Sequence, residues 1–208
     1  MSQPYDATSA ALITAAHAIL ESSGPEALTV RRIAAEAGMS TMNVYSRFDG
    51  KNGVIDELYA DGFRRLAAKL EAVPSTADAI DDILRVMSAY RQFAIDNPTY
   101  YRVMFRSATL PSYQPSQAAR DVAFTCLQSL IARVEQAQRA GQIAVVSEWS
   151  AQEIAAWLWA TCHGLVSVEA SDVAVPGVSW DGVFEHGARA ALLGLHPAIA
   201  DAEIPVLQ

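Results

Sequence analysis

One predicted helix in this sequence carries side chains suited to reading DNA. Val44 and Phe48 lie four residues apart, so they share the inward face of a helix that ends near residue 48. On the opposite face, the amide of Asn43 can pair with adenine, and the guanidinium of Arg47 can pair with guanine or hold a phosphate. The spacing predicts a groove-facing surface made of Met42, Asn43, Ser46 and Arg47.

Two short helices joined by a glycine turn would position this surface. Thr29 can cap a helix whose apolar stripe continues to Ala37, and Gly38 suits the left-handed residue that ends it. Ser40 is then the predicted N-cap of the second helix, which carries Asn43. Two short helices with such a turn form the helix-turn-helix pattern.

The charge distribution favours contact with DNA through one face only. The 208 residues carry a formal net charge of −8, which by itself disfavours phosphate binding. Within residues 29–51, however, four side chains are basic and two are acidic, whereas acidic side chains predominate after residue 53. A small basic patch on an acidic body is expected when a single face meets DNA.

Helical periodicity continues along the rest of the chain and predicts an all-α fold of about nine helices. Ser75 with Asp78 and Ser150 with Glu153 offer capping pairs at two helix starts. The predicted helices span about residues 12–21, 30–38, 41–48, 51–72, 75–97, 98–107, 116–140, 150–170 and 179–195. We expect a helix-turn-helix DNA-binding domain at residues 1–53 and a larger helical domain at residues 54–208.

Residues 12–54 resemble the DNA-binding domain of the TetR (tetracycline-repressor) family. The resemblance rests on helix one, on the run Thr-Val-x-x-Ile-Ala-x-x-Ala-Gly at 29–38 and on the run Tyr-x-x-Phe-x-x-Lys at 45–51. Family members often have Gly where this chain has Met42 and His where it has Arg47. The resemblance implies a dimeric, ligand-responsive regulator of transcription that contacts DNA phosphates through Tyr45 and Lys51. It also implies that residues 54–208 form a ligand-binding and dimerisation domain.

Residues around the third helix complete the candidate DNA-binding surface. Thr41 can reach a base or the DNA backbone, and Met42 can contact a thymine methyl group. Thr29, Arg31 and Arg32 are expected to brace the other side of the groove. The alternative is that all these positions are merely solvated. The candidate DNA-binding residues are Thr29, Arg31, Arg32, Ser40, Thr41, Met42, Asn43, Tyr45, Ser46, Arg47 and Lys51.

Residues 157–169 resemble a TetR subgroup that has a Trp and a His-Gly pair in this helix. Trp159 and His163 lie one turn apart and share a face. His163 is either a polar contact for a ligand or a core histidine with a partner in the protein. The aromatic and methionine side chains of helices five to eight either line a site for a mainly apolar effector or form ordinary core. The candidate ligand-binding residues are Met87, Tyr90, Phe93, Tyr101, Met104, Phe105, Phe124, Trp159 and His163.

The last two predicted helices are candidates for a dimer interface. The eighth is apolar nearly all round and therefore needs two partners, while the ninth carries small residues that allow close helix approach. We expect a four-helix bundle with a second subunit. The candidate interface residues are Trp157, Leu158, Leu165, Gly187, Ala190, Ala191 and Gly194.

Motifs of other function classes are missing from the sequence. It has no His-x-x-x-His, Cys-x-x-Cys or Gly-x-Ser-x-Gly spacing and no phosphate-binding glycine loop. Its two cysteines lie in apolar helical stretches, and its apolar runs are too short to span a membrane. We expect a cytoplasmic, non-enzymatic protein without catalytic residues, metal or cofactor. Repression is the expected role, with activation or small-molecule binding without an operator as the alternatives.

Overall fold

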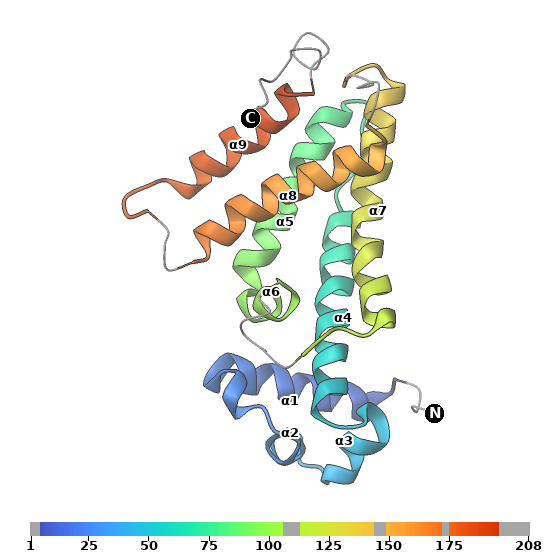
Figure 1. Ribbon diagram of the computed structural model, residues 1–208, viewed down its shortest axis with the longest axis vertical. Helices are drawn as coiled ribbons and strands as arrows, with labels where there is room; N and C mark the ends of the chain where they lie inside the picture. The colour runs from blue at the N-terminus through green and yellow to red at the C-terminus, as the bar shows by residue number, and fades with distance from the viewer. Residues whose placement is uncertain (1–4, 106–112, 144–148, 172–174, 196–208) are drawn as a thin grey trace, which may run out of the picture. The chain divides into compact units, whose positions relative to one another are not determined.

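A computed structural model describes residues 5–105, 113–143, 149–171 and 175–195 (Figure 1). All regular secondary structure in these residues is helical, so the predicted all-α class is confirmed. The elements are α1 (Ala7–Ser23), the 3-10 helix η1 (Pro25–Ala27), α2 (Val30–Glu36), α3 (Thr41–Phe48), α4 (Lys51–Glu71), α5 (Ala79–Asp96), α6 (Pro98–Phe105), α7 (Gln117–Arg139), α8 (Ala151–Glu169) and α9 (Trp180–Leu193). Residues 106–107, predicted as the end of the sixth helix, lie outside the described residues.

Local capping chemistry accounts for several of these boundaries. The Ser150 side chain accepts the N–H of Glu153, whose side chain in turn accepts the N–H of Ser150, so the predicted capping box at α8 is present. Ser179 likewise accepts the N–H of Gly182 at the start of α9. Gly38 ends the α2 region at φ 65°, in the left-handed region that was expected there.

Two helix starts differ from the sequence expectation. The helix α1 begins at Ala7, because Asp6 accepts the N–H of Ser9 at 2.8 Å and caps it one turn before the apolar stripe. The expected pairing of Ser75 with Asp78 at α5 is wrong. Asp78 caps α5 by itself, accepting the N–H of Asp81 at 3.0 Å, while the hydroxyl of Ser75 is bound to side chains of α7.

The chain groups into two compact units. The first comprises Met1–Arg65 and Asn97–Phe124, and the second comprises Leu66–Asp96 and Thr125–Gln208. These units differ from the two sequence-predicted domains, since most of α4 together with α6 groups with the first three helices. Both α4 and α7 contribute residues to each unit, so each of these helices is covalently continuous across a unit boundary.

The core of the first unit fixes α2 and α3 against α1. Fully buried side chains come from all three helices and from the segment between α1 and α2: Leu12, Ile19, Leu28, Ile33 and Val44. Burying such aliphatic side chains contributes roughly 1.5–3 kcal/mol each. Because α3 has only eight residues, its position depends on this packing rather than on its own helix propensity.

The helix α6 packs against both α1 and α4 within the first unit. The Tyr100 hydroxyl donates to Asp61 of α4 at 2.7 Å, and its ring lies 4.5 Å from that of His17 in α1. A Cβ atom at Gly62 would lie 2.7 Å from the sulfur of Met104. Glycine at position 62 therefore lets α6 approach α4 this closely without a shift of the Met104 side chain.

In the second unit, α5 is joined to α8 and α9 through one arginine. The Arg91 guanidinium donates to both carboxylate oxygens of Glu169 in α8, at 2.8 and 2.6 Å, and lies 2.7 Å from Asp181 in α9. The helices α8 and α9 pack side by side (Figure 1). A Cβ atom at Gly187 of α9 would lie 2.8 Å from Leu165 of α8, so this glycine permits their close contact.

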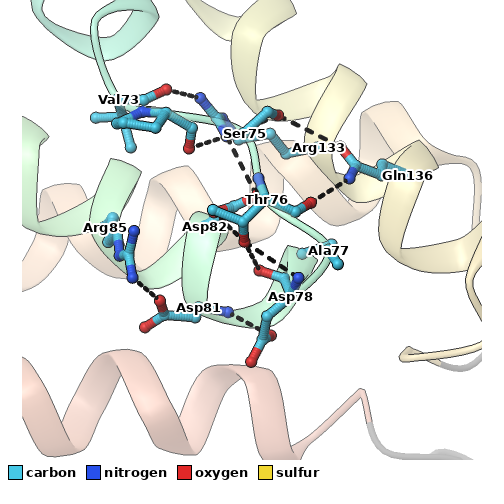
Figure 2. Close-up of polar contacts among 12 residues, drawn as sticks. Val73, Ser75, Thr76, Ala77, Asp78, Asp81, Asp82, Arg85, Arg133 and Gln136 are labelled. Carbon is cyan, nitrogen blue, oxygen red and sulfur yellow. Dashed lines mark hydrogen bonds and ion pairs between the residues drawn. The ribbon is translucent and has the colours of Figure 1, made fainter.

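The connection between α4 and α5 is held by buried charged groups of the second unit (Figure 2). Arg133 of α7 donates to the carbonyl oxygens of Val73 and Pro74. Asp82, which is fully buried, accepts the N–H of Thr76 at 2.6 Å and its hydroxyl at 3.0 Å. Arg133 and Asp82 lie 3.8 Å apart. These bonds satisfy the polar groups of a turn that would otherwise lack secondary-structure partners.

Candidate nucleic-acid interface

The helix α2 and the turn after it set the start of the recognition surface. The Thr29 hydroxyl accepts the N–H of Arg32 at 3.2 Å and so acts as the predicted N-cap of α2. Buried Ile33 and Ala34 hold the helix on the core. The N–H of Met39 bonds to the carbonyl of Ala34 at 2.8 Å and closes the turn toward α3. The predicted helix-turn-helix connection is therefore present.

The helix α3 has one buried position and a largely exposed face. Val44 is fully buried, whereas Met42 is 71% exposed and Tyr45 is 54% exposed. Thr41 and Ser46 are also exposed, and Asn43 is half-buried. The inward and outward positions in the first turns of α3 are therefore those that the spacing of Val44 and Phe48 predicted.

Polar contacts within α3 involve Ser40 and Asn43. The Asn43 amide nitrogen donates to the Ser40 hydroxyl at 3.3 Å, and the Ser46 hydroxyl donates to the Asn43 carbonyl at 3.2 Å. Ser40 is the N-cap residue by position, but its side chain accepts no backbone N–H. The bond between the Asn43 amide and Ser40 is exposed, so a base edge can replace it at small cost.

The corner between α3 and α4 depends on residues that the sequence patterns did not single out. Asp49 has φ 55° and Gly50 has φ 111°, so the backbone turns sharply there. A Cβ atom at Gly53 would lie 1.7 Å from the carbonyl oxygen of Phe48. Only glycine fits this position, because any side chain would push the start of α4 away from α3. Gly53 thereby places Lys51, which begins α4 and is half-buried.

Arg47 differs from the sequence expectation of a free groove-facing side chain. Its Nη2 donates to Oδ2 of Asp6 at 2.8 Å and its Nε to Oδ1 at 3.2 Å, while Nη1 donates to the Ser46 hydroxyl at 3.3 Å. Its side chain is only 13% exposed. The hydrogen bond from Arg47 holds the pKa of the Asp6 carboxyl well below its ordinary value.

The basic residues of α2 have different surroundings. Arg31 is exposed, whereas Arg32 donates from Nη2 to the Ser23 hydroxyl at the end of α1, at 2.7 Å. Both lie on the surface of the first unit, as does Thr29. Arg32 therefore has a local partner that it would have to leave in order to contact a phosphate.

The predicted ligand-binding residues are divided between the two units. Tyr101, Met104, Phe105 and Phe124 belong to the first unit, and Met87, Tyr90, Phe93, Trp159 and His163 belong to the second. Most are buried or half-buried, but Phe124 is 59% exposed and Trp159 is 38% exposed. The exposure of Phe124 does not fit a residue that lines an enclosed site.

His163 has partners on two helices of the second unit. Its Nδ1 lies 2.9 Å from the Tyr90 hydroxyl of α5, and its ring stacks on that of Trp159 at 5.6 Å between centroids. Burial lowers the pKa of His163, which favours the neutral ring. Tyr90 was predicted as a separate candidate, but no sequence rule paired it with a residue 73 positions away.

An aromatic group in the first unit includes two residues of α4 that sequence reasoning missed. The ring centroids of Tyr59 and Phe63 lie 4.9 Å apart, and those of Phe63 and Phe105 lie 5.4 Å apart. Tyr101 joins the group through Phe105 at 5.0 Å. The apolar spacing of α4 could have indicated these positions, but only contact with α6 distinguishes them from other core residues.

Several predicted dimer residues pack inside the subunit instead. Leu158 is completely buried and Ala191 is 6% exposed, so neither lies on the surface. Gly187 lies against Leu165, and Gly194 approaches Trp157, all within one chain. Ala190 and Gly194 remain exposed. The predicted interface set therefore combines residues that pack between α8 and α9 of one subunit with residues that stay exposed.

A different surface of these two helices exposes apolar or small side chains. It consists of Ala156, Trp159, Ala160, Gly164 and Val168 of α8 and Ala190, Leu193 and Gly194 of α9, and we call it the α8–α9 face. Leu193 is the most exposed of its large side chains, at 59%. An exposed surface of this composition is typical of a protein interface.

In the part of the chain that the structure describes, none of the helices combines the length and apolar character needed to span a membrane, and no group of three or more His, Cys, Asp or Glu side chains could hold a metal ion. Burial raises the pKa of the Cys126 and Cys162 thiols, which disfavours the reactive thiolate.

Family models match both parts of the chain. The model described as bacterial regulatory proteins, tetR family, matches residues 12–58. The model described as tetracyclin repressor-like, C-terminal domain, matches residues 83–191. The chain belongs to the TetR family. This TetR protein thus combines a helix-turn-helix with a C-terminal domain of the family type. The members of the family are DNA-binding regulators of transcription.

Solved structures of similar fold support the assignment. A protein of unknown function from Rhodococcus sp. RHA1 is 26% identical, with a TM-score of 0.77 over 93% of this chain and 99% of that chain. The TetR family transcriptional regulator PfmR from Thermus thermophilus is 17% identical, with a TM-score of 0.66 over 89% and 98%. The fatty acid degradation regulator FadR from Bacillus halodurans is 15% identical, with a TM-score of 0.69 over 93% and 98%. The latter two share the fold alone. No curated protein matched the sequence.

Proposed function

We propose that this TetR-family protein is a repressor that binds operator DNA as a homodimer and leaves it when a mainly apolar small molecule binds. The observation that carries the DNA-binding part is the exposed face of α3. Met42, Tyr45 and Ser46 project from a short helix whose buried Val44 fixes it to the core. Side chains on such a fixed support can read base edges with little loss of conformational entropy.

The first turns of α3 read the bases in this proposal. In a helix-turn-helix, residues in the N-terminal part of the recognition helix contact base edges. Thr41, Met42 and Asn43 occupy that part of α3. Tyr45 and Lys51 contact phosphates, and Arg31 with Arg32 supplies positive charge from α2. Base contacts set the sequence preference and phosphate contacts set the salt dependence.

Dimerisation occurs through the α8–α9 face. Leu193 and Val168 are large apolar side chains exposed there, while Ala160 and Gly164 allow another helix to approach closely. A two-fold dimer would present two copies of α3 to an inverted repeat, with half-sites about one DNA turn or more apart.

The effector binds among the apolar side chains of the second unit. Met87, Tyr90 and Phe93 are buried on α5, and Tyr90 contacts His163 beside the partly exposed Trp159. These side chains offer apolar surface with one hydroxyl and one imidazole as polar contacts, which suits a mainly apolar molecule.

Selection of bound duplexes from a random DNA library tests the DNA-binding part. We expect the protein to enrich an inverted repeat, with affinity that falls steeply as salt rises. A variant that carries both Asn43→Ala and Lys51→Ala serves as the control, since it keeps the buried positions of α3. Recovery of no preferred sequence would contradict operator binding, and recovery of single half-sites would contradict a two-fold dimer.

A further inference from the structure

The contact between Asp6 and Arg47 joins the first residue before α1 to the last turn of α3. The two residues are 41 positions apart and are linked by two hydrogen bonds, at 2.8 and 3.2 Å. Asp6 also caps α1 through its bond from the N–H of Ser9. The Asp6 carboxylate therefore caps α1 and also binds the guanidinium of Arg47 on the recognition helix.

The geometry of this pair resembles the way that arginine binds phosphate. The Nε and Nη2 atoms form a fork that grips two oxygen atoms of one acceptor. A DNA phosphate offers the same pair of oxygen atoms to the same fork. Arg47 lies in the last turn of α3, away from the N-terminal part that contacts base edges, so a phosphate is the DNA group that fits it best.

The pair lies at the surface, where an anion from outside can reach it. The side chain of Asp6 is 42% exposed and that of Arg47 is 13% exposed, so a phosphate can replace the carboxylate without leaving the guanidinium unpaired. Basic side chains are also few in this region, since Arg31, Arg32, Arg47 and Lys51 are all that residues 29–51 contain. The availability of each one therefore affects DNA affinity noticeably.

We propose that Asp6 competes with a DNA phosphate for Arg47 and thereby limits the affinity of the protein for DNA of any sequence. This inference rests on the proposed function. When α3 enters a groove, Arg47 exchanges the carboxylate of Asp6 for a phosphate, so DNA binding must first break the Asp6–Arg47 pair. Asp6 acts through Arg47 and is a positioning residue that does not itself contact DNA.

Asp6→Asn is the decisive variant. Asparagine caps a helix about as well as aspartate, so the bond from the N–H of Ser9 is kept while the charge is lost. Asp6→Ser, which keeps a capping oxygen, is a second variant, and thermal unfolding checks that both fold. The probes are the duplex selected by the wild type and a duplex of unrelated sequence, each titrated over a range of salt concentrations.

We expect Asp6→Asn to bind both duplexes several-fold more tightly than the wild type. Arg47→Gln should weaken DNA binding. In a plot of log K against log salt concentration, the slope for Arg47→Gln should be shallower than the slope for Asp6→Asn by about 0.9 per subunit. The gain from Asp6→Asn should vanish in the Asp6→Asn, Arg47→Gln double variant. Asp49→Asn removes one charge at the end of α3 and keeps a residue that tolerates the left-handed conformation, so it measures the effect of charge alone.

Unchanged or weaker binding by Asp6→Asn would overturn the inference. A gain that persists without Arg47, or that Asp49→Asn reproduces in full, would also overturn it, because competition for Arg47 would not be its cause. If the wild type bound no duplex at all, the proposed function itself would fail. Wild-type binding with no response to Asp6→Asn would contradict only the role of Asp6.

Discussion

Asn43 and Arg47 lie one turn apart on α3 but differ in what holds them. The Asn43 amide is bound only to the Ser40 hydroxyl among the contacts described, and this bond is exposed. Arg47 is held by a charged partner, Asp6, which directly precedes α1. The amide is therefore easily released for a base edge, whereas the guanidinium is released only to a competing anion. Base preference should depend more on Asn43 than on Arg47.

We expect Asn43→Ala to change the preferred base at one position of each half-site. A bidentate contact from Asn to adenine contributes about 1–3 kcal/mol of discrimination. Lys51→Ala, the matched comparison, should weaken binding to all sequences alike, since a phosphate contact carries no base information. Selection from a random library measures both effects. If the Asn43→Ala variant enriched the same sequence as the wild type, Asn43 would not read a base.

Residue exposure on α3 was predictable, but residue partners were not. The spacing of Val44 and Phe48 is local and indicates which side chains face outward. The pairing of Asp6 with Arg47 and that of Tyr90 with His163 join residues 41 and 73 positions apart. Such contacts depend on how helices pack, which helical periodicity does not specify. Gly53 was likewise overlooked, because its requirement arises from the carbonyl oxygen of Phe48 in another helix.

At the scale of elements, some helix ends were predicted from local capping, whereas the start of α1 was not, although its Asp6 cap is also local. The Ser150–Glu153 box at α8 and Gly38 after α2 both act within a few residues. The Ser75–Asp78 pairing was wrong because Arg133 and Gln136 of α7 bind Ser75. Side chains that are distant in the sequence therefore bind Ser75 in place of the local capping contact. The same limit applies to α8 and α9, where sequence alone did not separate contacts within a chain from contacts between chains.

The α8–α9 face can be tested with one charge. We expect Leu193→Glu to convert the dimer to monomer at micromolar concentration, because a carboxylate buried between subunits would lose its hydration. Sedimentation velocity measures the change. Ile95→Glu is the matched control, since Ile95 is also exposed, at 49%, but lies on α5. A Leu193→Glu variant that stayed dimeric, or equal loss in both variants, would remove Leu193 from the interface.

At the scale of the whole molecule, the proposed influence of an effector on DNA binding would pass through α4. It runs without interruption from Lys51, beside α3, to Glu71, and it contributes residues to both compact units. At its far end, Arg133 and Asp82 hold the connection to α5. A ligand that shifts residues of α5 therefore acts on a chain segment that is tied to α4. The sequence could indicate that α4 is one continuous helix, but not the bonds that hold its connection to α5.

We expect effector binding and DNA binding to oppose each other. Native mass spectrometry of the purified protein should identify a mainly apolar bound compound, which then serves as the titrant. If this compound binds the DNA-free arrangement better by about 1.4 kcal/mol, it lowers DNA affinity tenfold, and couplings of roughly 1–3 kcal/mol are typical. Thermodynamic reciprocity then requires the selected duplex to weaken binding of the compound by the same factor.

Calorimetric titration of the compound with and without the selected duplex measures that factor. Trp159→Ala and His163→Ala should both weaken binding of the compound, because they remove the stacked pair beside Tyr90. Phe124→Ala is the control, since this exposed side chain belongs to the other unit. Equal affinity for the compound in the presence and absence of DNA would exclude effector-driven release. Unchanged affinity in both α8 variants would place the effector elsewhere, because a molecule bound among Tyr90, Trp159 and His163 would lose contacts in each.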